Sequence, residues 1–204
     1  MDNLSLRIRL LLTILLFASF FNTKSCALET EMTSSFGQGI YALGVETLVL
    51  EGKSPSTFSN EDVMNFTIPL LERCAVNQKN EINSRQRMFH LLAGYYYLEA
   101  QRPDLGMYWA LRGAEIGSGG AMHILSFGLA EGKAVNSDMD QSSKWLILSY
   151  LYGHSHAIKN LKNGYQSNKL IPNLRAGMIY AKKWISEHPE LEQVNPTKDL
   201  SFIK

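Results

Sequence analysis

The sequence contains few cysteines and no excess of charge of either sign. Two of its 204 residues are cysteine, and 20 Lys and Arg stand against 19 Asp and Glu. A balanced charge supplies no electrostatic attraction for a polyphosphate backbone, so nucleic acid is excluded as a partner. With so few cysteines, the fold must be held together by packing rather than by a framework of disulfides.

The chain also lacks a hydrophobic run long enough to cross a bilayer, which takes about 20 residues. A run of 12 residues, 10–21, follows Arg7 and Arg9, and small residues close the segment at Ser25 and Ala27. This pattern is typical of a secretory signal peptide. We therefore expect residues 1–27 to be removed near Ala27. The protein would be exported, periplasmic or secreted, with no membrane span in its mature chain.

Two alternatives to that cleavage remain open. One is an uncleaved N-terminal anchor, and the other is a lipoprotein processed at Cys26, although Lys24 stands where a lipobox has small or aliphatic side chains. Cleavage after Ala27 leaves 17 basic and 18 acidic residues, a formal charge of −1. It also leaves Cys74 as the single cysteine, so the sequence predicts a buried thiol and no intramolecular disulfide.

No stretch alternates apolar and polar residues for long enough to predict a β-strand. Apolar residues recur instead at helical spacing, so the sequence predicts an all-α fold. Ser59 and either Ser137 or Asp138 are expected N-caps, Pro103 fits a first helical turn, and Pro69 should kink or split its helix. The predicted helices come in four pairs: 39–50 with 59–74, 84–100 with 103–116, 119–131 with 138–152, and 155–166 with 173–187.

Two tryptophans, 36 residues apart, stand in the same short pattern. Trp109 and Trp145 are each followed at offsets of 4, 8 and 12 by small residues. Leucine followed three residues later by glycine recurs at 91 and 94, 125 and 128, and 161 and 164. Periods of 34–36 residues are typical of a helical array in which each unit buries its apolar face on its neighbours. Because a helical glycine costs about 1 kcal/mol relative to alanine, these glycines predict close approach of a neighbouring helix.

These positions resemble the Sel-one-like repeat family, a relative of the tetratricopeptide repeats. The resemblance covers residues 85–165 well and 36–82 poorly. It implies a right-handed α-solenoid of about four antiparallel helix pairs over residues 28–190, with a polar tail at 191–204. The residues that carry it in one full unit are Ala121, Leu125, Gly128, Gly132, Val135, Asp138, Ser142, Trp145, Ser149, Gly153 and Ala157.

The family resemblance also implies a function. Similar proteins are adaptors, and many bacterial members are exported. The chain is therefore expected to bind another protein or a peptide through its concave surface, at the bacterial cell envelope or toward a host. It is expected to need no cofactor and no metal and to have no enzymatic activity.

Three consecutive tyrosines suggest where a partner would bind. Successive side chains on a helix point about 100° apart, so the tyrosines at 95, 96 and 97 cannot share one buried stripe. Tyr96 or Tyr97 should then be exposed, and exposed tyrosines are favoured binding anchors. His123 and Phe127, one unit later, could extend the surface. The alternative is that both faces of the helix are buried between neighbouring pairs.

Few residues suggest catalysis or metal binding. His154 and His156 lack the i, i+4 spacing of helical metal ligands, so the sequence predicts a solvated turn there rather than a zinc site. The alternative function is a cell-wall-acting hydrolase or a regulator of one. Direct glycoside cleavage needs paired carboxylates, and Glu99 and Glu131, near equivalent helix ends, are the pair the sequence offers.

Overall fold

The computed structural model of the protein describes residues 35–163 and 173–191. These ranges contain eight α-helices and no β-strand, which confirms the predicted all-α class. No helix within them is both long and apolar enough to cross a membrane. The helices are α2 (Phe36–Leu50), α3 (Asn60–Val76), α4 (Ile82–Gly94), α5 (Pro103–Ala114), α6 (Gly119–Glu131), α7 (Met139–Leu151), α8 (Ala157–Asn163) and α9 (Leu174–Glu187).

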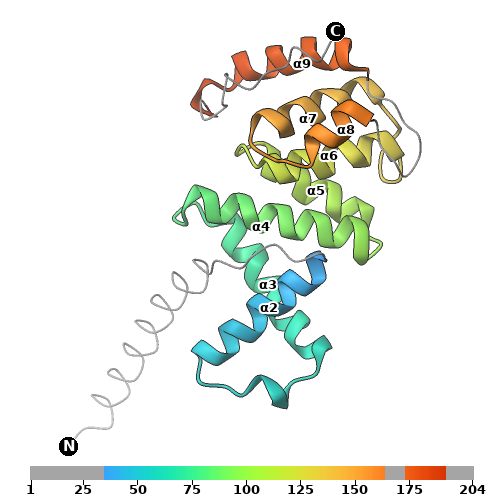
Figure 1. Ribbon diagram of the computed structural model, residues 1–204. Helices are drawn as coiled ribbons and strands as arrows, with labels where there is room; N and C mark the ends of the chain where they lie inside the picture. The colour runs from blue at the N-terminus through green and yellow to red at the C-terminus, as the bar shows by residue number, and fades with distance from the viewer. Residues whose placement is uncertain (1–34, 164–172, 192–204) are drawn as a thin grey trace, which may run out of the picture.

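The helices follow one another along an elongated molecule, with α2 and α3 at one end and α9 at the other (Figure 1). Each helix from α2 to α7 packs against the next one in the chain. In addition α4 packs against α6, and α9 packs against α7. The buried apolar side chains form one continuous core that runs through all of these contacts.

Side-chain caps set where most helices begin. Ser59 caps α3 and forms a capping box with Asp62, and Asp138 caps α7, both as the sequence predicts. Pro103 is accepted in the first turn of α5. Pro69 lies on the exposed side of α3, which runs unbroken through it, so the predicted split does not occur. Water can reach the carbonyl that the proline leaves without a donor.

The repeated glycines are sites of close approach, as predicted. A Cβ at Gly94 would overlap the ring of Phe36 from α2. At the equivalent Gly128 it would overlap the side chain of Met107 from α5. In both cases a bulky side chain of the preceding unit occupies the space that the glycine leaves. Gly164 lies outside the described residues.

The tryptophans fill the gaps between helices. Trp109 and Trp145 are each 7 % exposed. The Trp109 ring centroid lies 5.8 Å from that of Phe89 on α4, and the Trp145 centroid lies 5.6 Å from that of Trp184 on α9. Each large ring therefore joins two helices of the core, which is the structural role the sequence predicts.

The predicted helix 84–100 changes its geometry at the tyrosines. Alpha-helical hydrogen bonding ends at Gly94, and a turn of π-helix, η3 (Tyr95–Glu99), follows. The amide of Ala100 donates to the carbonyl of Tyr95, 2.9 Å away, across five residues instead of four. Such a turn inserts an extra residue and redirects the side chains after it. Here it points Tyr97 inward and brings Glu99 to the start of α2.

Cys74 is not the unpaired thiol that the sequence predicts. It is disulfide-bonded, and its side chain is 2 % exposed. The chain contains one other cysteine, Cys26, which lies outside the described residues. The prediction that the mature chain has no intramolecular disulfide applies to a chain without residues 1–27, so it stays a prediction. Cleavage after Ala27 would leave Cys74 without a second cysteine in its own chain.

Candidate functional site

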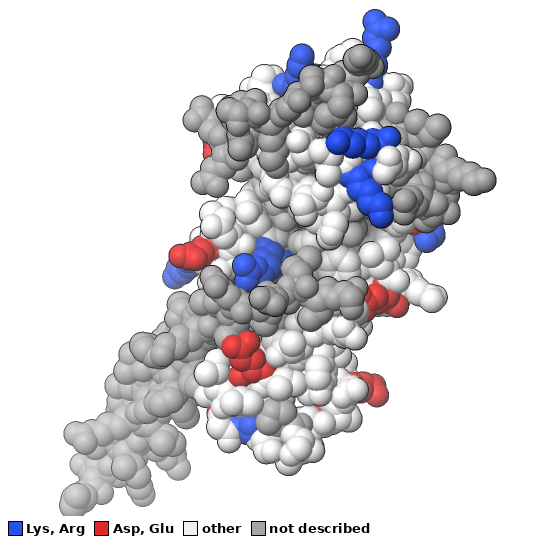
Figure 2. Space-filling view, in the orientation of Figure 1, with Lys and Arg blue, Asp and Glu red and all other residues white. Residues whose placement is uncertain are grey.

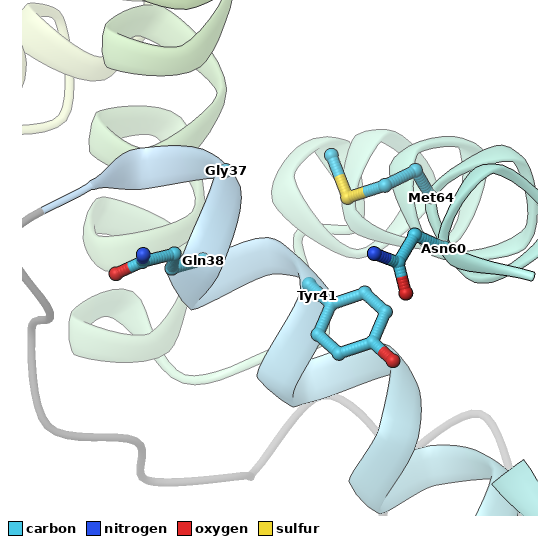
Figure 3. Close-up of a pocket in the computed structure, with 5 residues that line it drawn as sticks. All are labelled: Gly37, Gln38, Tyr41, Asn60 and Met64. Carbon is cyan, nitrogen blue, oxygen red and sulfur yellow. The ribbon is translucent and has the colours of Figure 1, made fainter. Parts of the chain in front are cut away.

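One hollow lies between α2 and α3 and has a volume of about 310 Å³. It is lined by Gly37, Gln38 and Tyr41 of α2 and by Asn60 and Met64 of α3. Figure 3 shows Tyr41 facing Asn60 and Met64, while Gln38 points away from α3. None of the described residues that line this hollow is charged.

A second hollow, which we call the α4–α6 hollow, has a volume of about 290 Å³ and a polar lining. It lies between two successive helix pairs, since α4, the start of α6 and the turn after α7 all contribute. Arg87 is the one cation among the ten described residues that line it, and no acidic side chain is among them. They are Asn83, Gln86, Arg87, His90, Ser118, Gly119, Gly120, Tyr152, Gly153 and His154.

Hydrogen bonds between the helices fix the walls of the α4–α6 hollow. The Gln86 side-chain amide donates to the carbonyl of Ile116, 2.7 Å away, and the Ser118 hydroxyl donates to the carbonyl of Gln86, 2.8 Å away. On the opposite wall the Ser149 hydroxyl donates to the carbonyl of Gly119 at 2.7 Å. The start of α6 is thus tied to both α4 and α7.

The first turn of α6, whose residues line this hollow, contains unpaired amides. Ser118 caps the helix, and its hydroxyl oxygen accepts from the amide of Ala121 at 3.4 Å. The amides of Gly119 and Gly120 donate no hydrogen bond to any described part of the chain. Free first-turn amides carry the positive end of the helix dipole, so this wall favours a negatively charged group.

His90 is the buried polar group of the hollow. Its side chain is 7 % exposed and makes no hydrogen bond within the described residues. Every fully buried side-chain nitrogen or oxygen in those residues does have a partner, so the unpaired imidazole nitrogens keep some contact with solvent, and His90 lines the hollow. Its ring lies against Gly120, where a Cβ would overlap it. Burial, and then repulsion from His154 and His156, lowers the pKa of His90 to about 3.

Four histidines meet beside the hollow, and we call them the histidine cluster: His90 of α4, His123 of α6, and His154 and His156 of the turn before α8. The His154 ring centroid lies 5.3 Å from that of His90, 4.8 Å from that of His123 and 5.4 Å from that of His156. Burial is the main cause that lowers the pKa of His123 to about 3 and that of His154 to about 4. These three rings are therefore neutral at pH 7.

The histidine cluster corrects the prediction of a solvated turn. His156 is exposed, but His154 is partly buried against rings from two other helices. Stacking of the units produces this contact, and spacing along the chain cannot reveal it. The cluster is a packing arrangement: the Nε2 atom of His123 lies 2.9 Å from the Asn160 side-chain amide, and no metal-holding group of His, Cys, Asp or Glu occurs in the described ranges.

The four residues predicted to bind a partner lie in different places. Tyr97 is 4 % exposed and donates from its hydroxyl to Glu131, 3.0 Å away. Phe127 packs against it, with ring centroids 5.9 Å apart. Tyr96 is partly exposed and donates to Glu72 of α3 at 3.0 Å. His123 belongs to the histidine cluster. The structure thus pairs Tyr97 with Phe127 and brings none of the four into the lining of the hollow.

Glu99 and Glu131 do not form a pair in a cleft. Glu131 accepts from Tyr97 and forms an ion pair with Lys133 at 2.9 Å. Glu99 binds the start of α2, and we call this arrangement the α2 carboxylate site. Its oxygens accept from the amides of Phe36 at 2.6 Å and Gly37 at 2.9 Å, and from the Ser35 hydroxyl at 3.0 and 3.1 Å.

Sequence reasoning missed His90, Gly119 and Gly120 as site residues. His90 stands between Phe89 and Leu91 in an apolar stripe, so nothing marks it as lining a polar hollow. One signal was present: serine, any residue and glycine occur in the same order at the start of α2 (35–37) and of α6 (118–120). That shared order marks two helix starts with similar caps.

Charged side chains of both signs are interspersed on the face that Figure 2 shows. The chain matches no family model, no curated protein and no solved structure. The resemblance to the Sel-one-like repeats therefore stays a prediction from the residues that carry it.

Proposed function

We propose that the protein is an exported helical-repeat scaffold that binds another protein or a peptide through the face formed by α4, α6 and the turn before α8. One observation carries this proposal. The α4–α6 hollow lies between two helix pairs and offers unpaired amides, a cation and a buried imidazole, none of which is hydrogen-bonded there to the described chain. Polar groups left open at the junction of several units suit a ligand better than they suit the fold.

The internal repetition supports a solenoid. The units built from α4–α5 and α6–α7 share a glycine that receives a side chain of the preceding unit and a buried tryptophan on the second helix. The first helices of these units, α4 and α6, also pack against each other. Together with the family resemblance, this favours a right-handed array whose first helices line the concave face. The signal-peptide pattern of residues 1–27 supports export.

A hydrolase is less well supported. Both nominated carboxylates are acceptors within the fold, Glu99 at the start of α2 and Glu131 beneath Tyr97. A general acid or nucleophile in glycoside cleavage must instead face the substrate across a cleft. We therefore retain binding as the proposed function.

Site-specific photo-crosslinking in the native host tests the proposed function. A photo-reactive residue placed at Asn83 or Arg87, both exposed and both at the hollow, should give a discrete covalent adduct with a partner. Tyr108 and Leu111, 49 % and 46 % exposed on α5, are the matched positions on another surface and should give none. Equal adducts from both pairs, or none from the hollow, would contradict the proposal.

A further inference from the structure

The geometry points to a carboxylate-binding site in the α4–α6 hollow. We propose that the first-turn amides of α6, together with Arg87 and His90, bind a single carboxylate group. The source of that carboxylate rests on the proposed function: it is an acidic side chain or a chain terminus of the partner. The site itself depends only on the residues that line the hollow and can be tested without a partner.

The chain contains an occupied example of the same chemistry. At the start of α2, Ser35 is the N-cap and Gly37 is the second helical residue. The Glu99 carboxylate spans the first two amides of that helix, with one oxygen on each, and also accepts from the Ser35 hydroxyl. A Cβ at Gly37 would lie 2.5 Å from the nearer Glu99 oxygen, so glycine is what allows the carboxylate to approach.

The start of α6 repeats this arrangement without the carboxylate. Ser118 is again the N-cap, and Gly120 is again the second helical residue. The first two amides, of Gly119 and Gly120, again point out of the helix, but they meet no acceptor in the described chain. Their residues line the hollow of about 290 Å³, and no acidic side chain is among its described lining residues.

His90 is a second and independent indication of a ligand. Its imidazole is nine-tenths buried, lies against Gly120 and has no hydrogen-bond partner among the described residues. A neutral imidazole has one N–H donor, which an anion in the hollow would accept. Burying a polar ring beside two unpaired amides is unfavourable unless a ligand or solvent satisfies them.

The charge of the lining favours a carboxylate over a phosphate. Arg87 is the one cation among its described residues, and its guanidinium can bind a planar carboxylate with two parallel hydrogen bonds. Neutral His90 and His154 supply donors but no charge at pH 7. One cation and a helix N-terminus balance a monoanion, whereas a phosphate dianion would remain undercompensated.

Nuclear magnetic resonance titration of the uniformly ¹⁵N-labelled protein tests the site directly. Sodium acetate, at constant ionic strength against sodium chloride, should shift the Gly119 and Gly120 amide resonances saturably. Inorganic phosphate should shift them more weakly. A blocked peptide with one internal aspartate, and a peptide with a free C-terminus and no acidic side chain, distinguish the two sources of the carboxylate. The peptide that binds more tightly than acetate identifies the source of the carboxylate.

Matched variants separate the site from general charge effects. Arg87→Gln should weaken acetate binding about tenfold or more, because the charge-assisted hydrogen bonds of the guanidinium are lost. Lys182→Gln removes an exposed cation of α9 and should leave the binding unchanged. Gly120→Ala, whose methyl group displaces His90, should weaken binding through geometry and without a change of charge.

Three results would overturn the carboxylate site: equal shifts with acetate and chloride, unchanged affinity in Arg87→Gln, or tighter binding of phosphate than of acetate. The proposed function fails separately, when the photo-reactive positions at Asn83 and Arg87 give no adduct in the host. Acetate can still bind in that case, so the two failures are distinguishable.

Discussion

The starts of α2 and α6 share a serine cap and a glycine at the second helical residue, yet one is filled and the other is open. At α2 the chain supplies its own acceptor, the Glu99 carboxylate. At α6 the His90 ring borders the corresponding amides, and no described acceptor reaches them. At α2 the motif binds a carboxylate of the chain, and at α6 we propose that it binds one supplied by a partner. Whether it serves folding or binding depends on what the neighbouring helix brings to it.

The largest expected effect is the loss of folding stability at acid pH, which arises from the buried histidines beside the start of α6. The pKa of His90 and that of His123 are about 3 in the fold, against an ordinary 6.5, so between these values the unfolded chain takes up protons that the folded chain excludes. The contribution of these two histidines to the free energy of unfolding is therefore fully present above pH 6.5 and is lost as the pH drops toward 3. Each histidine contributes a slope of about 1.4 kcal/mol per pH unit.

Chemical denaturation at pH 7, 6, 5 and 4 measures this slope. His90→Asn should reduce the slope of the free energy of unfolding against pH by the contribution of one histidine. Because the slope is compared and not the stability at pH 7, the test holds even if the variant is less stable. A free energy of unfolding that stays constant from pH 7 to 4 would show that the histidine cluster is not buried in a neutral state.

Replacing Gly120 or Gly37 by alanine should change the free energy of unfolding by different amounts at the two helix starts. Gly120→Ala forces a buried imidazole to move, which should destabilise the protein by about 1–3 kcal/mol. Gly37→Ala displaces the flexible end of the exposed Glu99 side chain, but alanine is favoured over glycine in a helix by about 1 kcal/mol, so the net effect should be under about 1 kcal/mol. Thermal or urea unfolding of both variants measures the difference. A greater loss of stability in Gly37→Ala than in Gly120→Ala would contradict this prediction.

Removing the internal carboxylate should make the start of α2 resemble that of α6. Glu99→Ala leaves the Phe36 and Gly37 amides without their acceptor and should cost about 1–2 kcal/mol, the range of a lost N-cap. Glu187→Ala is the control, because Glu187 is an exposed glutamate of α9. Added acetate should recover part of the loss in Glu99→Ala alone. Equal losses in the two variants would mean that the α2 carboxylate site contributes nothing.

The smallest effect on stability is expected at Arg87. The side chain is exposed and forms no ion pair in the described residues, so Arg87→Gln should change the free energy of unfolding by less than about 0.5 kcal/mol. Its effect belongs to ligand binding instead. Urea unfolding without acetate checks this value, and a loss above 1 kcal/mol would assign Arg87 a structural role.

Much of the fold could be predicted from the sequence because local chemistry determines it. The spacing of apolar residues located the helices, and the N-caps at Ser59 and Asp138 fixed where two of them begin. Gly94 and Gly128 were predicted to allow close approach, and each receives a side chain of the preceding unit. These features depend on neighbours in the chain or on the repeat period.

The candidate site could not be predicted, because it depends on contacts between units. His90 lines the hollow only because α4 packs against α6. The sequence predicted that Tyr96 or Tyr97 would be exposed and could not tell which, whereas the π-helical turn buries Tyr97 and leaves Tyr96 partly exposed. The disulfide at Cys74 was missed for a different reason. The cleavage site after Ala27 was taken as a premise, and it removed Cys26 from consideration.

The most direct test of the account follows four amides in one titration. Acetate is added to the wild-type protein and to Glu99→Ala, and the Phe36, Gly37, Gly119 and Gly120 amide resonances are recorded in both. The account predicts that Gly119 and Gly120 respond in both proteins, while Phe36 and Gly37 respond only in the variant. A wild-type protein whose Gly119 and Gly120 amides ignore acetate, beside a variant whose Phe36 and Gly37 amides bind it, would contradict the account.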